Sequence, residues 1–151
     1  MNVPCFRVYL DNCCLNRPFD DPGQDRIKLE VEAIAVIVRK VRRGEWVWVT
    51  SEILETERAA NPNEVKKALV SQMFASPFEP VVLTWADTER ALELCKLGMK
   101  AYDAFHVAAA ERGKCDVLLT TDDPLIAKAR KIGKQLRVAV ANPVDWLLEC
   151  L

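Results

Sequence analysis

The sequence alternates short apolar runs with longer stretches in which apolar residues recur at helical spacing. The short runs are rich in branched and aromatic residues and predict buried strands, at residues 6–10, 46–49, 80–84, 116–120 and 137–141. The longer stretches predict helices, at residues 26–43, from Ser51 onward, and at 62–75, 86–97, 103–112, 125–131 and 143–150. Since each link is long enough for a right-handed crossover, we expect an α/β fold, a three-layer α/β/α sandwich with a parallel sheet of about five strands. Residues 1–151 are expected to form a single domain.

The link between the first two predicted strands divides into two parts. Residues 26–43 carry the stripe of an amphipathic helix, with apolar side chains at Ile27, Val31, Ile34, Val38 and Val41. Residues 12–23 instead contain two prolines and end in the turn signal Pro22-Gly23, so we predict a loop there. This loop would cross the crevice beyond the carboxyl ends of the strands.

Four acids are expected at one rim of the sheet. Asp11 follows the first strand, and Asp122 follows the fourth. Asp103 opens a helix that is otherwise almost entirely apolar. Glu57 falls on the inward face of its predicted helix, between the directions of two apolar side chains. Ligands bind beyond the carboxyl ends of strands in open α/β sheets, so the four acids mark a candidate site.

The residue types at this rim favour a hard divalent cation. Carboxylates gathered in a partly desolvated site repel one another and are costly without a partner. Oxygen ligands without cysteine or histidine select Mg²⁺ or Mn²⁺ over Zn²⁺. Such a site supports hydrolysis of a phosphodiester, because the cation activates water and offsets charge on the phosphate.

Each acid also has a purely structural interpretation. Asp103 would serve as a helix cap, Asp122 as a turn residue, Asp11 as a strand end, and Glu57 as an ion-pair partner of Arg58 or a lysine. Pro124 suits the first position of the next helix, which makes Asp123 the expected N-cap and leaves Asp122 without a capping role. Only the joint placement of the acids favours the metal site.

Several neighbouring side chains are candidates for supporting roles. His106 lies one turn after Asp103 and would either orient a carboxylate or substrate, or simply pack as a hydrogen-bonded core histidine. Ser51 is expected to cap the following helix and Thr120 to end its strand, with contact to water or metal as the alternative. Candidate phosphate ligands are basic residues for which a solvated surface position is the default: Arg17, Lys40, Arg42 and Arg43.

Composition adds little electrostatic direction. The 151 residues include 21 lysines and arginines against 22 acids, and 50% of them are hydrophobic, so nucleic-acid contact would depend on local patches. The six cysteines include no C-x-x-C pair and are expected to be reduced thiols. We find no signal peptide and no apolar run long enough to span a bilayer, and expect a cytoplasmic protein without membrane contact.

The ordered set of motifs resembles the PIN-domain nucleases, which include the VapC-like toxin ribonucleases of prokaryotic toxin-antitoxin pairs. The resemblance covers nearly the whole chain and rests on four segments: Tyr9-Leu10-Asp11, Thr50-Ser51 to Glu57, Asp103-Ala104-Phe105-His106-Val107-Ala108, and Thr120-Thr121-Asp122-Asp123. The family often has an asparagine two residues after its first aspartate. Here that position is Cys13, and Asn12 precedes it.

This resemblance implies a metal-dependent ribonuclease that is usually a homodimer. The acids matching the family's ligands for Mg²⁺ or Mn²⁺ are Asp11, Glu57, Asp103 and Asp122, with Glu55 and Asp123 as fallbacks for the second and fourth. Asn12 would substitute for the family asparagine unless the loop is reshaped. An antitoxin protein is the partner implied by the toxin members.

Three functions compete at this stage. The first is a metal-dependent endoribonuclease acting on single-stranded or looped RNA, with the toxin of a toxin-antitoxin pair as one version of this function. The second is a catalytically silent PIN fold that serves as an RNA-binding or protein-interaction module. The third is a small-molecule phosphohydrolase that uses the same cations.

Overall fold

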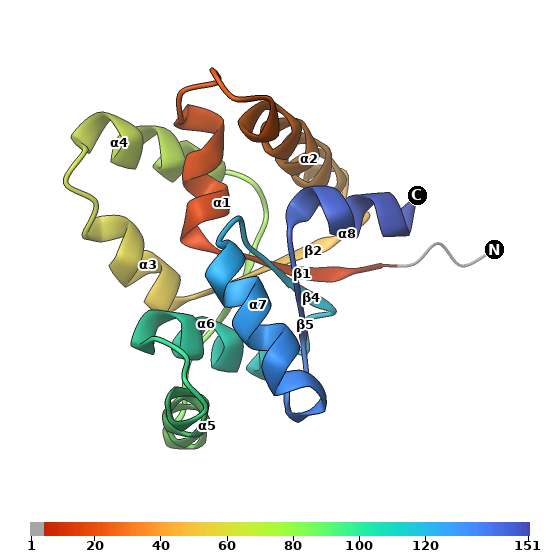
Figure 1. Cartoon of the computed structure of the whole chain (residues 1–151). Helices are drawn as coiled ribbons and strands as arrows, with labels where there is room; N and C mark the ends of the chain where they lie inside the picture. The colour runs from red at the N-terminus through yellow and green to blue at the C-terminus, as the bar shows by residue number, and fades with distance from the viewer. Residues whose placement is uncertain (1–4) are drawn as a thin grey trace.

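The computed structural model describes residues 5–151 and contains a parallel sheet of five strands in the order β3-β2-β1-β4-β5 (Figure 1). The strands are β1 (Arg7–Leu10), β2 (Val47–Ser51), β3 (Glu79–Val81), β4 (Val117–Leu119) and β5 (Ala139–Ala141). Each neighbouring pair is parallel, as the crossover lengths predicted. The α/β fold with a five-stranded parallel sheet is confirmed.

Helices connect the strands and cover both faces of the sheet (Figure 1). They are α1 (Asn12–Asn16), α2 (Asp25–Arg42), α3 (Glu52–Ala59), α4 (Glu64–Met73), α5 (Trp85–Lys96), α6 (Ala101–Arg112), α7 (Asp123–Ile132) and α8 (Pro143–Cys150), with short 3₁₀ turns at Arg17–Phe19 and Gly133–Gln135. Within residues 5–151, no helix combines the length and apolar character needed to cross a bilayer. All six cysteines are free thiols.

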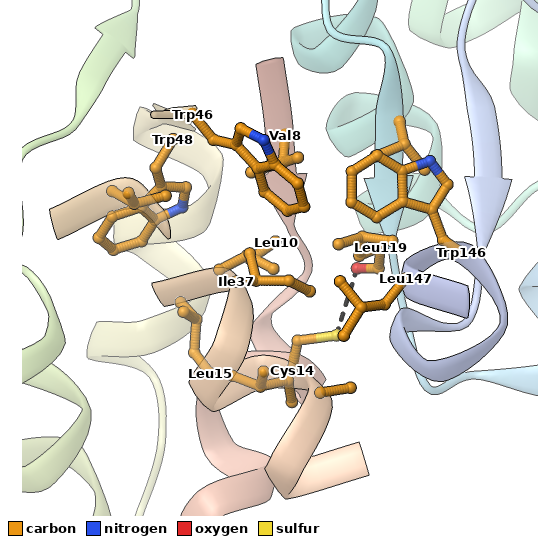
Figure 2. Packing of buried hydrophobic residues seen from close by; sticks show 14 of the residues in the cluster. Val8, Leu10, Cys14, Leu15, Ile37, Trp46, Trp48, Leu119, Trp146 and Leu147 are labelled. Atoms are coloured by element: carbon orange, nitrogen blue, oxygen red, sulfur yellow. Dashed lines mark hydrogen bonds between the residues drawn. The ribbon is translucent and has the colours of Figure 1, made fainter. Parts of the chain in front are cut away.

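The core consists of two apolar clusters, one on each face of the sheet. Side chains alternate between the faces of a strand, so Val8 and Leu10 of β1 join one cluster while Tyr9 joins the other. The first cluster packs α1, α2 and α8 on the sheet, and Figure 2 shows Val8 and Leu10 beneath Trp46 and Trp146. The second cluster buries α5, α6 and α7. Both faces of the sheet are therefore covered, which matches the nearly continuous apolar character of its strands.

The segment predicted as a loop over residues 12–23 is partly helical, and that prediction was wrong for α1. Asp11 lies in the extended N-cap position, and its side chain accepts a hydrogen bond from the backbone N–H of Asn12. Cys14 and Leu15 are fully buried against the first cluster, and the Cys14 thiol donates to the Leu119 carbonyl (Figure 2). A capping aspartate and two apolar anchors outweigh the turn-forming residues that follow.

The order of the strands creates a topological switch point between β1 and β4. From β1 the chain builds outward to β2 and β3, and then returns to the other side of β1 to add β4 and β5. The chain segments after β1 and β4 separate as they leave the sheet, although the Asp11 N–H still donates to the Leu119 carbonyl at 2.9 Å. A switch point at the carboxyl ends of parallel strands is the usual ligand-binding crevice of such sheets.

Candidate metal centre

Asp11 lies at the centre of this crevice and is held from two sides. Its Oδ1 accepts the Asn12 N–H at 2.8 Å, and its Oδ2 accepts the Thr120 hydroxyl at 2.8 Å. Only 6% of the residue is exposed. The carboxylate therefore does more than end a strand: it caps α1 and connects the ends of β1 and β4.

Glu57 reaches the same place from α3, as its position on the inward face predicted. Its Oε1 lies 3.1 Å from Nε2 of the buried His106, and that nitrogen lies 3.7 Å from Oδ1 of Asp11. One ligand atom from each of these three residues lies within 4.8 Å of the other two, a spacing that fits one metal ion. Arg58 was the alternative ion-pair partner of Glu57. It pairs instead with the exposed Glu55 at 2.6 Å, so it does not neutralise Glu57.

Asp103 lies in the first turn of α6 without capping it. The N-cap position is Lys100, so the capping interpretation of Asp103 does not hold. Burial, together with the carboxylates of Asp11, Asp122 and Glu57, raises the pKa of Asp103 to about 6. His106 acts in the opposite direction, but burial and the like charges outweigh it. An acid perturbed in this way marks a candidate functional site.

The capping roles of Asp122 and Asp123 are the reverse of the prediction. Asp122 is the N-cap of α7, and its Oδ1 accepts the Leu125 N–H at 3.4 Å. Asp123 is the first helical residue and forms a two-pronged ion pair with Arg26, at 2.7 and 2.8 Å. Asp123 is thus neutralised away from the other acids, whereas the charge of Asp122 acts on Asp103. Asp122 is the better candidate ligand despite its cap.

The supporting residues lie around Asp11. Ser51 caps α3 as predicted, by accepting the Leu54 N–H. Asn12 contributes its backbone N–H, while its side-chain Oδ1 is buried without a hydrogen-bond partner among the described residues. Cys13 is the side chain that reaches the site, with its Sγ 3.5 Å from Oδ2 of Asp11 and 3.3 Å from Oγ1 of Thr120. At position 13, where the PIN resemblance implied an asparagine, a thiol therefore contacts Asp11.

The predicted phosphate ligands are not gathered at the acids. Arg17 is engaged with the buried Glu30 at 2.9 Å and with Asp20 at 3.1 Å. The other three lie at the end of α2, immediately before β2 begins, and therefore at the amino ends of the strands: Lys40, Arg42 and Arg43. The acids lie at the opposite, carboxyl ends.

Two lysines that the sequence reasoning missed do lie beside the acids. Lys100 and Lys128 line a small hollow of about 80 Å³ together with Asp103 and Asp122. No ion pair of either lysine occurs within residues 5–151. The Lys128 side chain lies over Gly98. A Cβ added at position 98 would come within 2.9 Å of Nζ of Lys128. The sequence held one signal for Lys100, because this residue precedes Asp103 by three positions, just before the expected start of the helix.

The donor set at this rim fits Mg²⁺ or Mn²⁺. Asp11 and Glu57 lie within the spacing of one ion, whereas Asp103 and Asp122 line the neighbouring hollow and are not part of that compact group. None of the four acids is paired with a lysine or arginine within residues 5–151. Hard cations prefer such oxygen ligands, and a cation here would relieve the repulsion that raises the pKa of Asp103. Lys100 and Lys128 add positive charge to the same rim.

The fold and this acidic rim define a class of α/β domain with a carboxylate site at its topological switch point. The family model described as the PIN domain matches residues 8–131, which include all four acids. The chain therefore belongs to the PIN-domain family. No curated protein matches the sequence.

Two solved structures share this fold. VapBC2 from Rickettsia felis, crystallised with a DNA fragment from its promoter, superposes with a TM-score of 0.57 over 90% of this chain and 98% of that chain, at 14% sequence identity. PAE2754 from Pyrobaculum aerophilum gives a TM-score of 0.50 over 95% of this chain and 88% of that chain, at 17% identity. At these identities the likeness concerns the fold alone.

Proposed function

We propose that this protein is a metal-dependent endoribonuclease whose ligands for Mg²⁺ or Mn²⁺ are Asp11, Glu57, Asp103 and Asp122. The observation that carries the proposal is geometric: the carboxylates of Asp11 and Glu57 meet at the topological switch point with the spacing of a metal-ligand set. The pKa of Asp103, raised by burial and by the neighbouring carboxylates, supports it. Membership of the PIN-domain family supports the same assignment. When bound, the cation would lower the pKa of a water molecule and offset negative charge on the scissile phosphate.

The protein's own residues have distinct roles in this proposal. Asp11 is fixed by Thr120 and the Asn12 N–H, so it offers a rigid carboxylate at the centre of the crevice. Asp103 and Asp122 face the hollow that also holds Lys100 and Lys128. We assign the two lysines to the phosphates that flank the cleaved bond, where positive side chains bind the RNA backbone without reading its sequence.

The test is cleavage of a structured RNA in the presence of Mn²⁺ by the parent, Asp11→Asn and Asp103→Asn. Asparagine caps helices about as well as aspartate, so Asp11→Asn should keep α1 while losing one charge. We expect cleavage to fall by about 100-fold or more in both variants, a loss of roughly 3 kcal/mol of transition-state stabilisation. Cleavage at the parent rate in both would refute the mechanism.

One observation favours the second candidate, a silent PIN fold that binds RNA or protein. A thiol, Cys13 Sγ, contacts Asp11 where the resemblance implied an amide. Calorimetry with Mg²⁺ and Mn²⁺ separates the candidates, because a silent module would show no specific binding at the acids. Hydrolysis of nucleotide esters without cleavage of RNA would instead identify a small-molecule phosphohydrolase.

We extend the proposal to partners and location. A cytoplasmic toxin of this family would have an antitoxin, and an adjacent small reading frame for a DNA-binding protein would support that role. A homodimer is supported by large apolar side chains left exposed around β3 and the start of α5, where Val82 and Trp85 are 74% and 75% exposed. Sedimentation of the parent and Trp85→Glu tests this, since the variant is expected to be monomeric.

A further inference from the structure

His106 is the only histidine of the chain and has no role in the mechanism proposed above. It lies in the middle of α6, is 1% exposed, and lies between Tyr9 of β1 and Glu57 of α3. Together with Asp11 and Glu57 it has the spacing of a metal-ligand set. A histidine among carboxylates suits Zn²⁺, whereas carboxylates alone suit Mg²⁺ and Mn²⁺. The role of His106 therefore decides which cation the site prefers.

A continuous chain of hydrogen bonds runs through His106. The Leu54 N–H donates to Oγ of Ser51 at 3.3 Å, and that oxygen lies 2.7 Å from the Tyr9 hydroxyl. The Tyr9 hydroxyl lies 2.6 Å from Nδ1 of His106, whose Nε2 lies 3.1 Å from Oε1 of Glu57. The chain links Ser51, the cap of α3, to Glu57, which lies nearly two turns further along the same helix.

Only one direction of donation along this chain gives every donor an acceptor. Besides the Tyr9 hydroxyl, no acceptor for the Ser51 O–H occurs within residues 5–151, so the Tyr9 O–H donates to Nδ1 of His106 and the ring proton lies on Nε2, facing Oε1 of Glu57. Tyr9 then accepts from the Ser51 hydroxyl, which itself accepts from Leu54. In the reverse direction the buried Ser51 O–H would have no acceptor within residues 5–151. A buried donor without a partner costs about 1–3 kcal/mol, which selects the first direction.

We propose that Ser51 and Tyr9 lock His106 in the tautomer protonated at Nε2, so that His106 positions the Glu57 carboxylate instead of ligating the cation. A nitrogen that carries a proton has no lone pair for a metal. His106 holds Oε1 of Glu57 and leaves Oε2 for the ion, as outer residues commonly orient metal ligands. This inference rests on the proposed metal site, and it makes Tyr9 and His106 positioning residues for a centre whose ligands are all oxygen atoms.

The direct test is nitrogen-15 NMR of the full-length chain, in which one histidine yields one pair of ring signals. We expect the proton on Nε2 both in metal-free protein and after saturation with diamagnetic Mg²⁺. A proton on Nδ1 in the metal-free protein would overturn the proposal. So would transfer of the proton from Nε2 to Nδ1 on addition of Mg²⁺, because that change reports ligation by Nε2.

A matched pair of variants tests the positioning role. Glutamine places an amide N–H close to Nε2 and can still donate to Glu57, whereas leucine cannot. We expect Mn²⁺ affinity within about 3-fold of the parent in His106→Gln and about 10-fold weaker in His106→Leu, with Tyr9→Phe in between. Equal losses in the glutamine and leucine variants would contradict positioning through the N–H and indicate packing alone. The NMR result on the parent decides the tautomer even if a variant fails to fold.

These readouts are independent of nuclease activity. Mn²⁺ binding with the predicted tautomer but no RNA cleavage would reject the proposed function and leave the positioning role intact. RNA cleavage by a protein whose His106 is protonated at Nδ1 would support the proposed function and reject the positioning role.

Discussion

The two ends of the sheet treat their charges in opposite ways. At the amino ends, the Arg7 guanidinium bonds both oxygens of Glu79, at 2.7 and 3.1 Å, and the Arg7 N–H donates to Asp116 at 2.7 Å. The hydrogen bonds from Arg7 hold the pKa of Glu79 below its usual value. Each acid at this end has a donor, and the region needs no ligand.

At the carboxyl ends, Asp123 pairs with Arg26, but the carboxylates of Asp11, Asp103 and Asp122 have no arginine partner within residues 5–151. The pKa of Asp103 is raised to about 6 there, because burial and the carboxylates of Asp11, Asp122 and Glu57 all disfavour its charge. The pKa of a carboxyl group is thus raised at one end, at Asp103, and lowered at the other, at Glu79. The comparison indicates that the charge pattern of the carboxyl-end rim is suited to binding a cation rather than to stability.

The largest expected difference between the two ends is the response to Mn²⁺. At 100 times its dissociation constant, the ion should raise the free energy of unfolding of the parent by about 2.7 kcal/mol. Asp11→Asn should lose most of this gain, because it removes the central ligand, whereas Asp116→Asn at the amino end should keep it. Chemical denaturation with and without Mn²⁺ measures both. An equal gain in the two variants would remove the distinction between the ends.

The second-largest expected effect is an increase in the free energy of unfolding when the Asp103 carboxylate is removed. The pKa of Asp103 is about 6 in the folded protein, against an ordinary value of 3.8. The contribution of Asp103 to the free energy of unfolding is therefore fully present below pH 3.8 and is lost as the pH rises through about 6. The difference between the two pKa values corresponds to at most roughly 3 kcal/mol, and solvent screening of the half-buried side chain reduces it to about 1 kcal/mol. In metal-free buffer near neutral pH, Asp103→Asn should therefore be more stable than the parent by about 1 kcal/mol.

The pH dependence provides the control for that prediction. Urea unfolding near pH 4 should show no advantage for Asp103→Asn, because the parent carboxyl is then protonated as well. A variant less stable than the parent at neutral pH without metal would show that the acids do not repel one another.

The smallest effect concerns the lysines. Lys128→Ala should weaken binding of single-stranded RNA about 3-fold and reduce the salt dependence by about 0.7 in the slope of log K against log salt, as expected for one lost phosphate contact. Arg43→Ala, at the other end of the sheet, should change neither. Fluorescence anisotropy over a series of salt concentrations checks this, and a larger effect of Arg43 would place the RNA path elsewhere.

Much of the fold was predictable because its signals are periodic and local. The five strands were found from short branched runs, and the parallel order followed from the length of the crossovers. α1 was missed because it is a five-residue helix among turn-forming residues, held by an Asp11 cap and by the tertiary burial of Cys14 and Leu15. A short helix stabilised by such contacts leaves little periodic pattern.

The site was predictable as a set of acids but not as a geometry. The positions of Asp11 and Asp122 after strands, and of Glu57 on an inward face, are local properties of the sequence. The exchange of capping roles between Asp122 and Asp123 depends on Arg26, which approaches from α2 and pairs with Asp123. Likewise, the hydrogen bonds of His106 join residues 97 and 49 positions apart, to Tyr9 and Glu57. No spacing rule reports such contacts.

The position of a bound cation tests the central claim most directly. Anomalous diffraction from a crystal soaked with Mn²⁺ should show one or two peaks within coordination distance of the carboxylates of Asp11 and Asp103, with His106 hydrogen-bonded to Glu57 and not coordinated. A fully occupied Mn²⁺ elsewhere, with no anomalous density between these carboxylates, would contradict the account.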